Sequence, residues 1–237
     1  MRKKNYPRLI LAFFGLITIS SFSVLQAQEI KASFELIESE DDYSKTIVHD
    51  ILQGSDDFIW MGTVDGLYQF NGYSFNIYSH RIGDTSSLSS NTIRSIFEDK
   101  SGYIWVGTQE GGLNRFHKVY QTFDHFSQQS EGGFDSNNAW EIYQDSKGRL
   151  WIGTWSYGLY MIPNPEAPTQ EIEFINYKHD KENATSISHN IVRKVFEDSK
   201  GRVWIGTQGG GLNLFVESTN SFKRYMHDPD MPNSLNH

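Results

Sequence analysis

The sequence has no cysteine among its 237 residues. This absence excludes a disulfide scaffold, a zinc site with cysteine ligands and a catalytic thiol. The eight histidines are dispersed, and no two have the His-x-x-x-His spacing of a helical zinc site. We therefore predict no metal site, no cofactor and no catalytic residue in this chain.

Basic residues are outnumbered by acidic ones. The chain has 21 lysines and arginines against 29 aspartates and glutamates, a net charge of −8. This balance argues against a broad basic face, and we predict no nucleic-acid partner. Aromatic residues, by contrast, are abundant, with 6 Trp, 12 Tyr and 16 Phe. Disordered chains lack so much aromatic surface, so most of the length is expected to fold.

Long apolar runs are absent except near the N-terminus. Four cations, the last of them Arg8, precede the apolar stretch 9–19, and Ala27 marks a cleavage point. We predict that residues 1–27 are a secretory signal peptide and that the chain is exported. Loss of the four cations changes the net charge from −8 to −12. An uncleaved membrane anchor is the alternative, although a spanning helix needs about 20 apolar residues.

The rest of the chain is a repeat. Four segments share the pattern Trp-x-Gly-Thr, beginning at Trp60, Trp105, Trp151 and Trp204, with spacings of 45, 46 and 53 residues. An insertion around Pro163–Pro168 accounts for the longer third interval. A period of about 40–50 residues is typical of a propeller or a solenoid.

Each period contains four short apolar runs. In the second period they cover residues 92–97, 103–108, 113–116 and 122–126, and they are rich in Ile, Val, Thr, Trp and Phe. Runs of this length and composition predict strands rather than helices. Four strands per period, joined by tight turns, form the blade of a β-propeller.

The first turn of three periods has the form Asp-x-x-Gly, at residues 99–102, 145–148 and 198–201. The Asp side chain accepts hydrogen bonds from the turn, and the Gly adopts positive φ, so the pattern predicts a hairpin. The first period has Gly54-Ser55-Asp56-Asp57 instead, which predicts a turn that is built differently.

We predict an all-β fold of four-stranded antiparallel blades, with four full repeats that form an incomplete arc of a seven-bladed propeller. A closed four-bladed ring is the alternative. The predicted divisions are a signal peptide at 1–27, an N-terminal segment with a lone outer strand (Phe34–Ile37) at 28–46, blades at 47–90, 91–137, 138–189 and 190–232, and the start of a further repeat at 233–237.

The repeat Asn-x-Ile…Asp-x-x-Gly-x-Ile-Trp-x-Gly-Thr…Gly-Gly-Leu-Asn-x-Phe, followed by Phe-x-x-Tyr, resembles the two-component regulator propeller repeat. The linker at 179–190 is also similar to the linkers of that family. The resemblance covers roughly residues 34–237. It implies the periplasmic sensor region of a hybrid two-component histidine kinase of Bacteroidetes-type bacteria, anchored in the inner membrane.

In that family two seven-bladed propellers precede a β-sandwich, a transmembrane helix and a kinase. The resemblance therefore implies that the remaining blades and the downstream sensor domains are partners, and that the parent protein is a homodimer. It also implies that an oligosaccharide is the ligand and polysaccharide utilisation the regulated process. No kinase motif occurs here, so this chain is expected to bind and not to catalyse. A secreted propeller enzyme acting on carbohydrate and an inactive truncated gene product are the alternatives.

The third repeat departs most from the common pattern, and departures on loops can build a binding site. Trp140 is aligned with Ile93 and Val192, with a two-residue shift of this alignment as the alternative. Trp155 and Tyr157 replace small or polar residues of a turn. These three aromatic residues are the predicted ligand-binding residues. The alternative is that they pack against a neighbouring blade or a partner domain.

The repeated residues are predicted to build the scaffold. The tryptophans would pack between blades, and the Gly two residues later would let two backbones approach closely. The predicted scaffold residues are Trp60, Gly62, Trp105, Gly107, Trp151, Gly153, Trp204 and Gly206.

Overall fold

The computed structural model describes residues 46–128 and 133–235. The predicted signal peptide at 1–27 and the predicted outer strand at 34–37 lie outside the described residues. The chain divides into two units, 1–38 and 39–237, and every described residue belongs to the second. Within the described part, no helix has the length and apolar character needed to cross a membrane.

The described residues form four antiparallel sheets, each made of four consecutive strands. This confirms the predicted all-β fold of four-stranded blades. Two short 3₁₀ helices, η2 (Thr169–Glu171) and η3 (Glu217–Thr219), accompany the strands. The strands are β1 (Val48–Gln53), β2 (Ile59–Thr63), β3 (Leu67–Phe70), β4 (Phe75–Tyr78), β5 (Ile93–Glu98), β6 (Ile104–Thr108), β7 (Leu113–His117), β8 (Thr122–Phe126), β9 (Ala139–Gln144), β10 (Leu150–Thr154), β11 (Leu159–Ile162), β12 (Ile175–Tyr177), β13 (Val192–Glu197), β14 (Val203–Thr207), β15 (Gly211–Val216) and β16 (Ser221–Tyr225).

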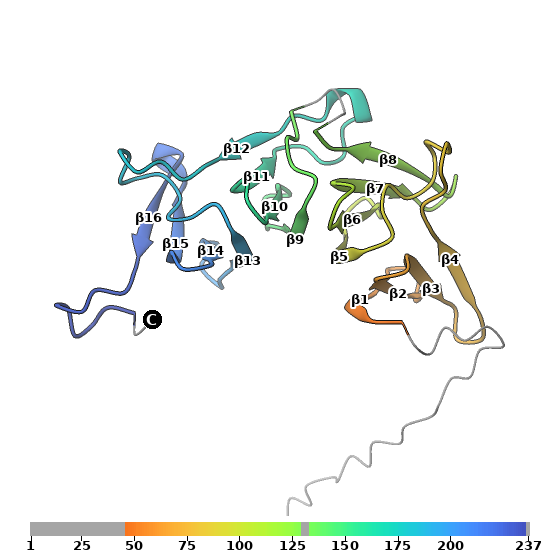
Figure 1. The fold of residues 1–237 in the computed structure, drawn as a ribbon, viewed down its shortest axis with the longest axis horizontal. Coiled ribbons are helices and arrows are strands. Elements are labelled where there is room, and N and C mark those ends of the chain that lie inside the picture. Colours follow the sequence, from red (N-terminus) through yellow and green to blue (C-terminus); the bar gives the residue numbers. More distant parts are fainter. Residues whose placement is uncertain (1–45, 129–132, 236–237) are drawn as a thin grey trace, which may run out of the picture. The chain divides into compact units, whose positions relative to one another are not determined.

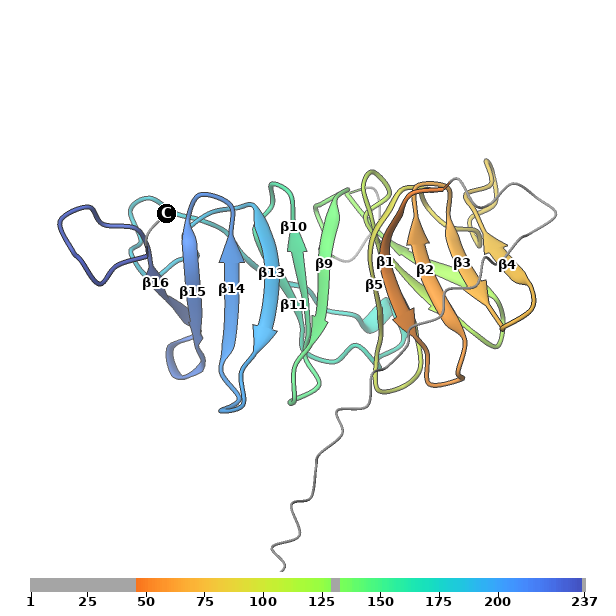
Figure 2. The same cartoon turned by 90° about the horizontal axis from the view of Figure 1, so that it is seen from below.

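The sheets follow one another in chain order, and their first strands are neighbours. β1 contacts β5, β5 contacts β9, and β9 contacts β13 (Figures 1 and 2). We call these four the inner strands. The sheets of the described part do not close into a ring (Figure 1), so the alternative of a closed four-bladed propeller is wrong.

The core consists of three apolar clusters, and each joins two consecutive sheets. Trp60 is fully buried and meets Phe116 of the second sheet with its ring centroid at 5.6 Å. Trp151 likewise meets Phe215 of the fourth sheet at 5.0 Å. Trp204, in the last sheet, is only half-buried. The indoles of the earlier sheets therefore stabilise the contact with the following sheet.

Glycines lie where consecutive sheets approach most closely. A Cβ added at Gly107 would lie 2.7 Å from the carbonyl oxygen of Ala139, on the inner strand of the following sheet. Gly62 and Gly153 face the following inner strand in the same way. At Gly206 the nearest atoms belong to Lys194 of its own sheet, 3.9 Å away. The strand-two glycine is thus required by packing in the first three sheets.

The Asp-x-x-Gly turn is fastened to the repeated tryptophan. In the second sheet, Asp99 Oδ1 accepts the backbone N–H groups of Ser101 and Tyr103, both at 3.0 Å. Its Oδ2 accepts the indole N–H of Trp105 at 2.7 Å. Burial nonetheless raises the pKa of Asp99. The same bond recurs from Trp151 to Asp145 (2.8 Å) and from Trp204 to Asp198 (2.9 Å).

The first turn corrects one prediction. Its main chain is closed as in the other sheets, with Gly54 N donating to Phe58 O at 2.8 Å and Asp57 N to Gly54 O at 3.0 Å. Asp57 adopts φ 64° where the other turns have glycine. The main chain is therefore not built differently. What changes are the side-chain hydrogen bonds of the turn, because Gly54 has no carboxylate and Trp60 Nε1 finds no hydrogen-bond partner among the described residues.

A second set of hydrogen bonds joins consecutive sheets. The side chain of the last residue of an inner strand accepts them from the first turn of the sheet before it. Glu98 accepts the backbone N–H and the hydroxyl of Ser55, both at 2.6 Å. Glu197 accepts the same two groups of Ser146 at 2.7 and 2.6 Å. Gln144 accepts the backbone N–H of Lys100 at 3.1 Å. Each sheet thus caps the first turn of the sheet before it.

The insertion of the third repeat is held by Arg115 on β7, whose side chain is 2 % exposed. Its Nη1 donates to the carbonyl oxygens of Pro165 (3.0 Å) and Ala167 (2.8 Å). Its Nη2 donates to Thr169 Oγ1 (2.8 Å) and to Asp124 Oδ2 (3.0 Å). This side chain therefore joins the second sheet to the insertion of the third.

Two of the linkers between sheets share a histidine contact. His80 Nδ1 lies 2.7 Å from Leu88 O, and His179 Nδ1 lies 2.9 Å from Ile187 O. In the segment after β16, His227 Nδ1 lies 2.7 Å from Leu235 O. The segment 227–235 therefore has the same contact, from a histidine ring to the carbonyl oxygen eight residues later, as the linkers that precede β5 and β13.

Candidate functional site

Each inner strand carries a bulge at the same place in its pairing with strand two. The register shifts lie between Val48 and Asp50, between Ile93 and Ser95, at Gly153/Thr154 opposite β9, and between Val192 and Lys194. A bulge redirects the side chain of the extra residue. The extra residues are His49, Arg94, Trp140 and Arg193.

This register corrects the alignment of Trp140. Ala139 pairs with Thr154 just as Ile93 pairs with Thr108, so Ala139 is the counterpart of the aliphatic residue. Trp140 is the counterpart of Arg94. The error arose from two adjacent asparagines, because Asn137 and not Asn138 stands 14 residues before the repeated tryptophan, as Asn91 does in the second repeat.

The structure brings two of the predicted site residues together. The indole rings of Trp140 and Trp155 lie with centroids 4.4 Å apart at an interplanar angle of 31°. The guanidinium carbon of Arg193 lies 4.4 Å from the Trp155 centroid and 4.8 Å from that of Trp140. Three groups with nearly equal separations cannot form a linear stack. Arg193 therefore lies beside Trp140 and not on the opposite face of Trp155.

Arg94 extends this group on the side of the second sheet. Its guanidinium carbon is 4.7 Å from the Trp140 centroid. We call His49, Arg94, Trp140, Arg193 and Trp155 the bulge cluster. All five side chains come from inner-strand bulges or, for Trp155, from the turn between β10 and β11.

Neutral acceptors hold the two arginines. Arg94 donates to Gln109 Oε1 and, at 3.0 Å, to His49 Nε2. His49 Nδ1 lies 2.7 Å from the carbonyl oxygen of Ile93. These two contacts fit a neutral imidazole that donates from Nδ1 and accepts at Nε2. Arg193 Nε donates to Gln208 Oε1 at 3.0 Å.

Two donors of the cluster are buried without an acceptor among the described residues, namely Arg94 Nε and Trp140 Nε1. A buried donor that lacks an acceptor costs about 1–3 kcal/mol. The bulge cluster is therefore rich in donors and positive charge and short of acceptors.

The carboxylates nearest in sequence to the cluster are engaged elsewhere. Asp50 Oδ2 accepts the backbone N–H of Ile96 at 2.8 Å. Glu141 forms an ion pair with Lys194 at 2.8 Å, and burial raises its pKa although Lys194 acts in the opposite direction. No group of three or more His, Asp or Glu side chains in the described part is placed to hold a metal ion.

The third predicted site residue makes different contacts. Gln128 Nε2 donates to the Tyr157 hydroxyl at 2.6 Å, and Lys178 Nζ lies 5.5 Å from the ring centroid. The ring also packs against the apolar cluster between the second and third sheets. Tyr157 therefore takes part in that interface, and its role in ligand binding stays a prediction.

Comparison with known proteins follows the same repeat. The model of the two-component regulator propeller family matches residues 87–110, 133–156 and 186–209. Each matched segment runs from a linker through the inner strand and strand two to the turn that follows. Three of the four repeats therefore match the two-component regulator propeller repeat.

Individual relatives share parts of their length with this chain. A curated protein of Formosa agariphila, named Histidine kinase P4, is 34% identical over 80 residues, which are 33% of this chain and 6% of the relative. The extracellular domain assigned to hybrid two-component system BT4673 of B. thetaiotaomicron is 26% identical with a TM-score of 0.61, covering 76% of this chain and 25% of that one. That of BT3049 is 23% identical with a TM-score of 0.63, covering 78% and 25%. The chain thus spans about a quarter of those two structures.

The sequence reasoning missed Arg94 and Arg193 as members of the propeller's candidate site. A signal for them existed in a paired substitution. The second and fourth repeats carry Arg at the bulge and Gln at the turn, as Arg94 with Gln109 and Arg193 with Gln208. The third repeat replaces both members with tryptophan. In each of these three repeats the two residues are in contact.

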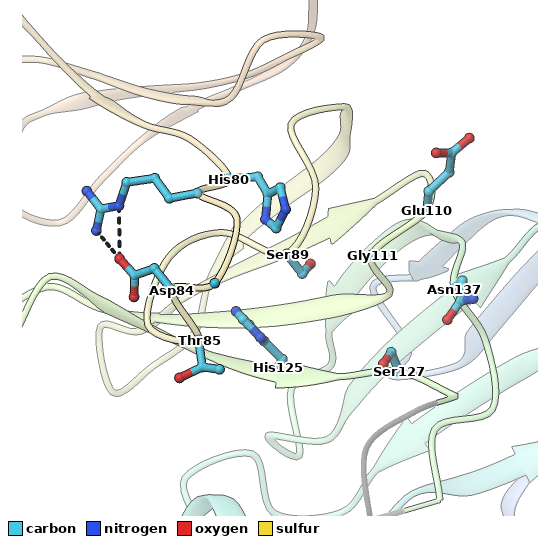
Figure 3. Close-up of a pocket in the computed structure, with 11 residues that line it drawn as sticks. His80, Asp84, Thr85, Ser89, Glu110, Gly111, His125, Ser127 and Asn137 are labelled. Carbon is cyan, nitrogen blue, oxygen red and sulfur yellow. Dashed lines mark hydrogen bonds and ion pairs between the residues drawn. The ribbon is translucent and has the colours of Figure 1, made fainter.

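A cavity of about 290 Å³ lies beside the turn that carries Gln109. His80 of the linker and His125 of β8 point into it, and Ser89 lies between them (Figure 3). The Ser89 hydroxyl is buried without a partner among the described residues. In the fourth sheet the position of His125 is taken by Arg224, whose guanidinium donates to Asn183 O and Ser186 O.

Proposed function

We propose that this regulator propeller is the ligand-sensing part of a hybrid two-component receptor, exported to the periplasm, and that it responds to oligosaccharides during polysaccharide utilisation. The likeness to the extracellular domain of BT4673 and to a histidine kinase of Formosa agariphila supports the proposal. The role assigned to this chain is binding, and the kinase activity belongs to the parent protein.

One observation carries the proposal. Trp140 and Trp155 are the nonrepeated members of an otherwise regular array, and they lie together at the rim formed by the bulges and the strand two–three turns. An aromatic ring offers a flat apolar surface against which the C–H groups of a sugar pack. The rest of the fold keeps this pair in place through the packing of β9 and β10.

We also propose that further blades of the same repeat cover both ends of the array. Ile51 is 63% exposed, whereas its counterparts Ile96, Ile142 and Val195 are at most 5% exposed because a preceding sheet covers them. At the other end Phe196 is 56% exposed. These residues match the ones that form the interfaces between the sheets present. In the parent, a homodimer of such propellers would transmit the ligand-dependent change.

Calorimetric titration of the 237-residue chain with neutral and acidic oligosaccharides of four or more sugars tests the proposal. Trp155→Ala should lower the affinity for the sugar that binds by about three- to tenfold. Tyr73→Ala, which removes an aromatic ring that is 96% exposed and distant in the fold, is the matched control and should leave the affinity unchanged. Failure of every sugar to bind the folded chain would contradict the proposal.

A further inference from the structure

We propose that the bulge cluster binds the anionic groups of an acidic oligosaccharide, whose sugars carry carboxylate or sulfate, through the guanidinium groups of Arg94 and Arg193. The inference rests on the proposed function and adds to it the chemical class of the ligand. It also assigns the specificity to two arginines that stand at equivalent bulges on either side of Trp140.

The first support is uncompensated charge. The acceptors of Arg94 are a glutamine and a neutral histidine, and the acceptor of Arg193 is a glutamine. Neither arginine has a carboxylate partner among the described residues. Both positive charges therefore remain available to an anion.

This state is unusual within the chain. The net charge is −8, and four other arginines lie against carboxylates. A fifth, Arg224, is enclosed by the carbonyl oxygens of its linker. The four pairs are Arg81 with Asp84, Arg115 with Asp124, Arg149 with Asp145, and Arg202 with Asp198. In this acidic chain, the two neighbouring guanidinium groups have no carboxylate partner among the described residues. We infer that their partner is an anion outside those residues.

The second support is preorganisation. Arg94 and Arg193 are each held by a glutamine and by the ring of Trp140, so their guanidinium groups are fixed before a ligand arrives. The unpaired donors Arg94 Nε and Trp140 Nε1 add to the shortage of acceptors. A carboxylate or sulfate supplies acceptor oxygens in the forked geometry that a guanidinium binds.

The third support is the placement of the nearby acids. Asp50 and Glu141 follow the bulges of the first and third sheets, yet they bond to Ile96 N and to Lys194. They do not neutralise the arginines. A sugar whose charged group reaches Arg193 would bring its ring against Trp155, 4.4 Å from that guanidinium.

The test compares matched probes on the full chain by isothermal titration calorimetry. The probes are a uronic-acid tetrasaccharide, a sulfated tetrasaccharide and the uncharged counterpart of each with the same linkage. Gln208→Glu places a carboxylate on Arg193 without removing the arginine, and Arg193→Gln removes the charge. Arg202→Gln is the control, because Arg202 also lies over a repeated tryptophan but is paired with Asp198.

We expect at least one acidic probe to bind tighter than its uncharged counterpart, and its affinity to fall with added salt. Gln208→Glu and Arg193→Gln should each weaken that binding by about ten- to a hundredfold, as expected for a charge-assisted hydrogen bond. Arg202→Gln should not weaken it. Which acidic probe binds identifies the group as carboxylate or sulfate.

Two outcomes would overturn the inference. In the first, the uncharged probe binds as tightly as the acidic one and its affinity is the same for the Gln208→Glu chain. The chain would then bind oligosaccharides, but the inference that they are acidic would be wrong. If no probe binds a chain whose circular dichroism and melting curve are those of a folded β protein, the proposed function fails as well. Identical melting curves for the Gln208→Glu and wild-type chains ensure that the comparison reports on binding.

Discussion

The sharpest test of the fold is the replacement of Arg115 by methionine. The guanidinium group makes hydrogen bonds to Asp124, Pro165, Ala167 and Thr169 while its side chain is 2 % exposed. Methionine retains much of the apolar stem and removes every one of these bonds. The substitution therefore isolates the polar part of the contact between the second sheet and the insertion.

The expected loss follows from what remains unpaired. Removal of one member of a buried ion pair typically destabilises a protein by about 3–5 kcal/mol. Asp124 keeps bonds to Thr169 Oγ1 at 2.6 Å and to His117 Nε2 at 2.7 Å, which favours the lower end of this range. The two carbonyl oxygens of the insertion lose their donor. At about 2–4 °C per kcal/mol for a domain of this size, the melting temperature should fall by about 6–20 °C.

Thermal and urea unfolding followed by circular dichroism measure the loss. Arg81→Met is the matched control, because it breaks an ion pair between Arg81 and Asp84 at a site where the arginine side chain is 68% exposed. That variant should have the same melting temperature as the wild type. A loss below about 1 kcal/mol for Arg115→Met would refute the reasoning, since surface pairs already reach that value.

Three further predictions concern single contacts. In urea unfolding, Trp105→Phe should destabilise the chain by about 1–3 kcal/mol more than Trp60→Phe. The reason is that, of these two tryptophans, only Trp105 donates a hydrogen bond to a carboxylate. Equal losses of stability would contradict this prediction. Gly107→Ala should cost about 1–3 kcal/mol and Gly206→Ala less than about 0.5 kcal/mol, since an added Cβ collides with the following sheet at Gly107 and not at Gly206. Burial opposes ionisation of Asp124, but bonds from neighbouring side chains outweigh it and lower its pKa. The carboxylate therefore adds stability that is present above the unfolded pKa of about 4 and is lost as the pH falls through the folded value, so Asp124→Asn should flatten the acid limb of a stability–pH curve.

The sequence predicts the architecture well because the repeat states each element four times. The Asp-x-x-Gly turn, the Trp-x-Gly-Thr strand and the short apolar runs each recur with the same spacing, so one doubtful period is corrected by the others. The first turn shows the limit of this reasoning. Asp57 adopts φ 64°, the conformation that glycine has in the other turns. The backbone of the turn is therefore the same, although the sequence pattern predicts a different turn.

The candidate site is harder to predict because it depends on a bulge. A bulge shifts the pairing by one residue, and sequence spacing alone does not show on which residue it falls. Trp140 was therefore aligned with Ile93, and the two arginines at the equivalent bulges were overlooked. Trp155 was predicted as a site residue because it stands out in a turn of otherwise small or polar residues. Tyr157 stands out in the same way, and its ring packs against the apolar cluster between the second and third sheets. A departure from the repeat does not by itself distinguish a residue that contacts a ligand from one that packs at an interface.

The repeat separates two kinds of position, those that fix the packing of the sheets and those at the bulges and turns of the rim. Trp105 with Asp99, and Glu98 with the turn at Ser55, fix the contacts within and between sheets and recur along the chain. The bulge residue and its partner on the next turn contact each other. They vary as a pair, with Arg and Gln in two repeats and Trp and Trp in a third. Exchange of such a pair alters charge and shape at the rim while the sheets beneath it keep their packing. The specificity of the rim should therefore follow these pairs, and transplanting the Arg–Gln pair onto the third repeat should change the ligand preference more than the melting temperature.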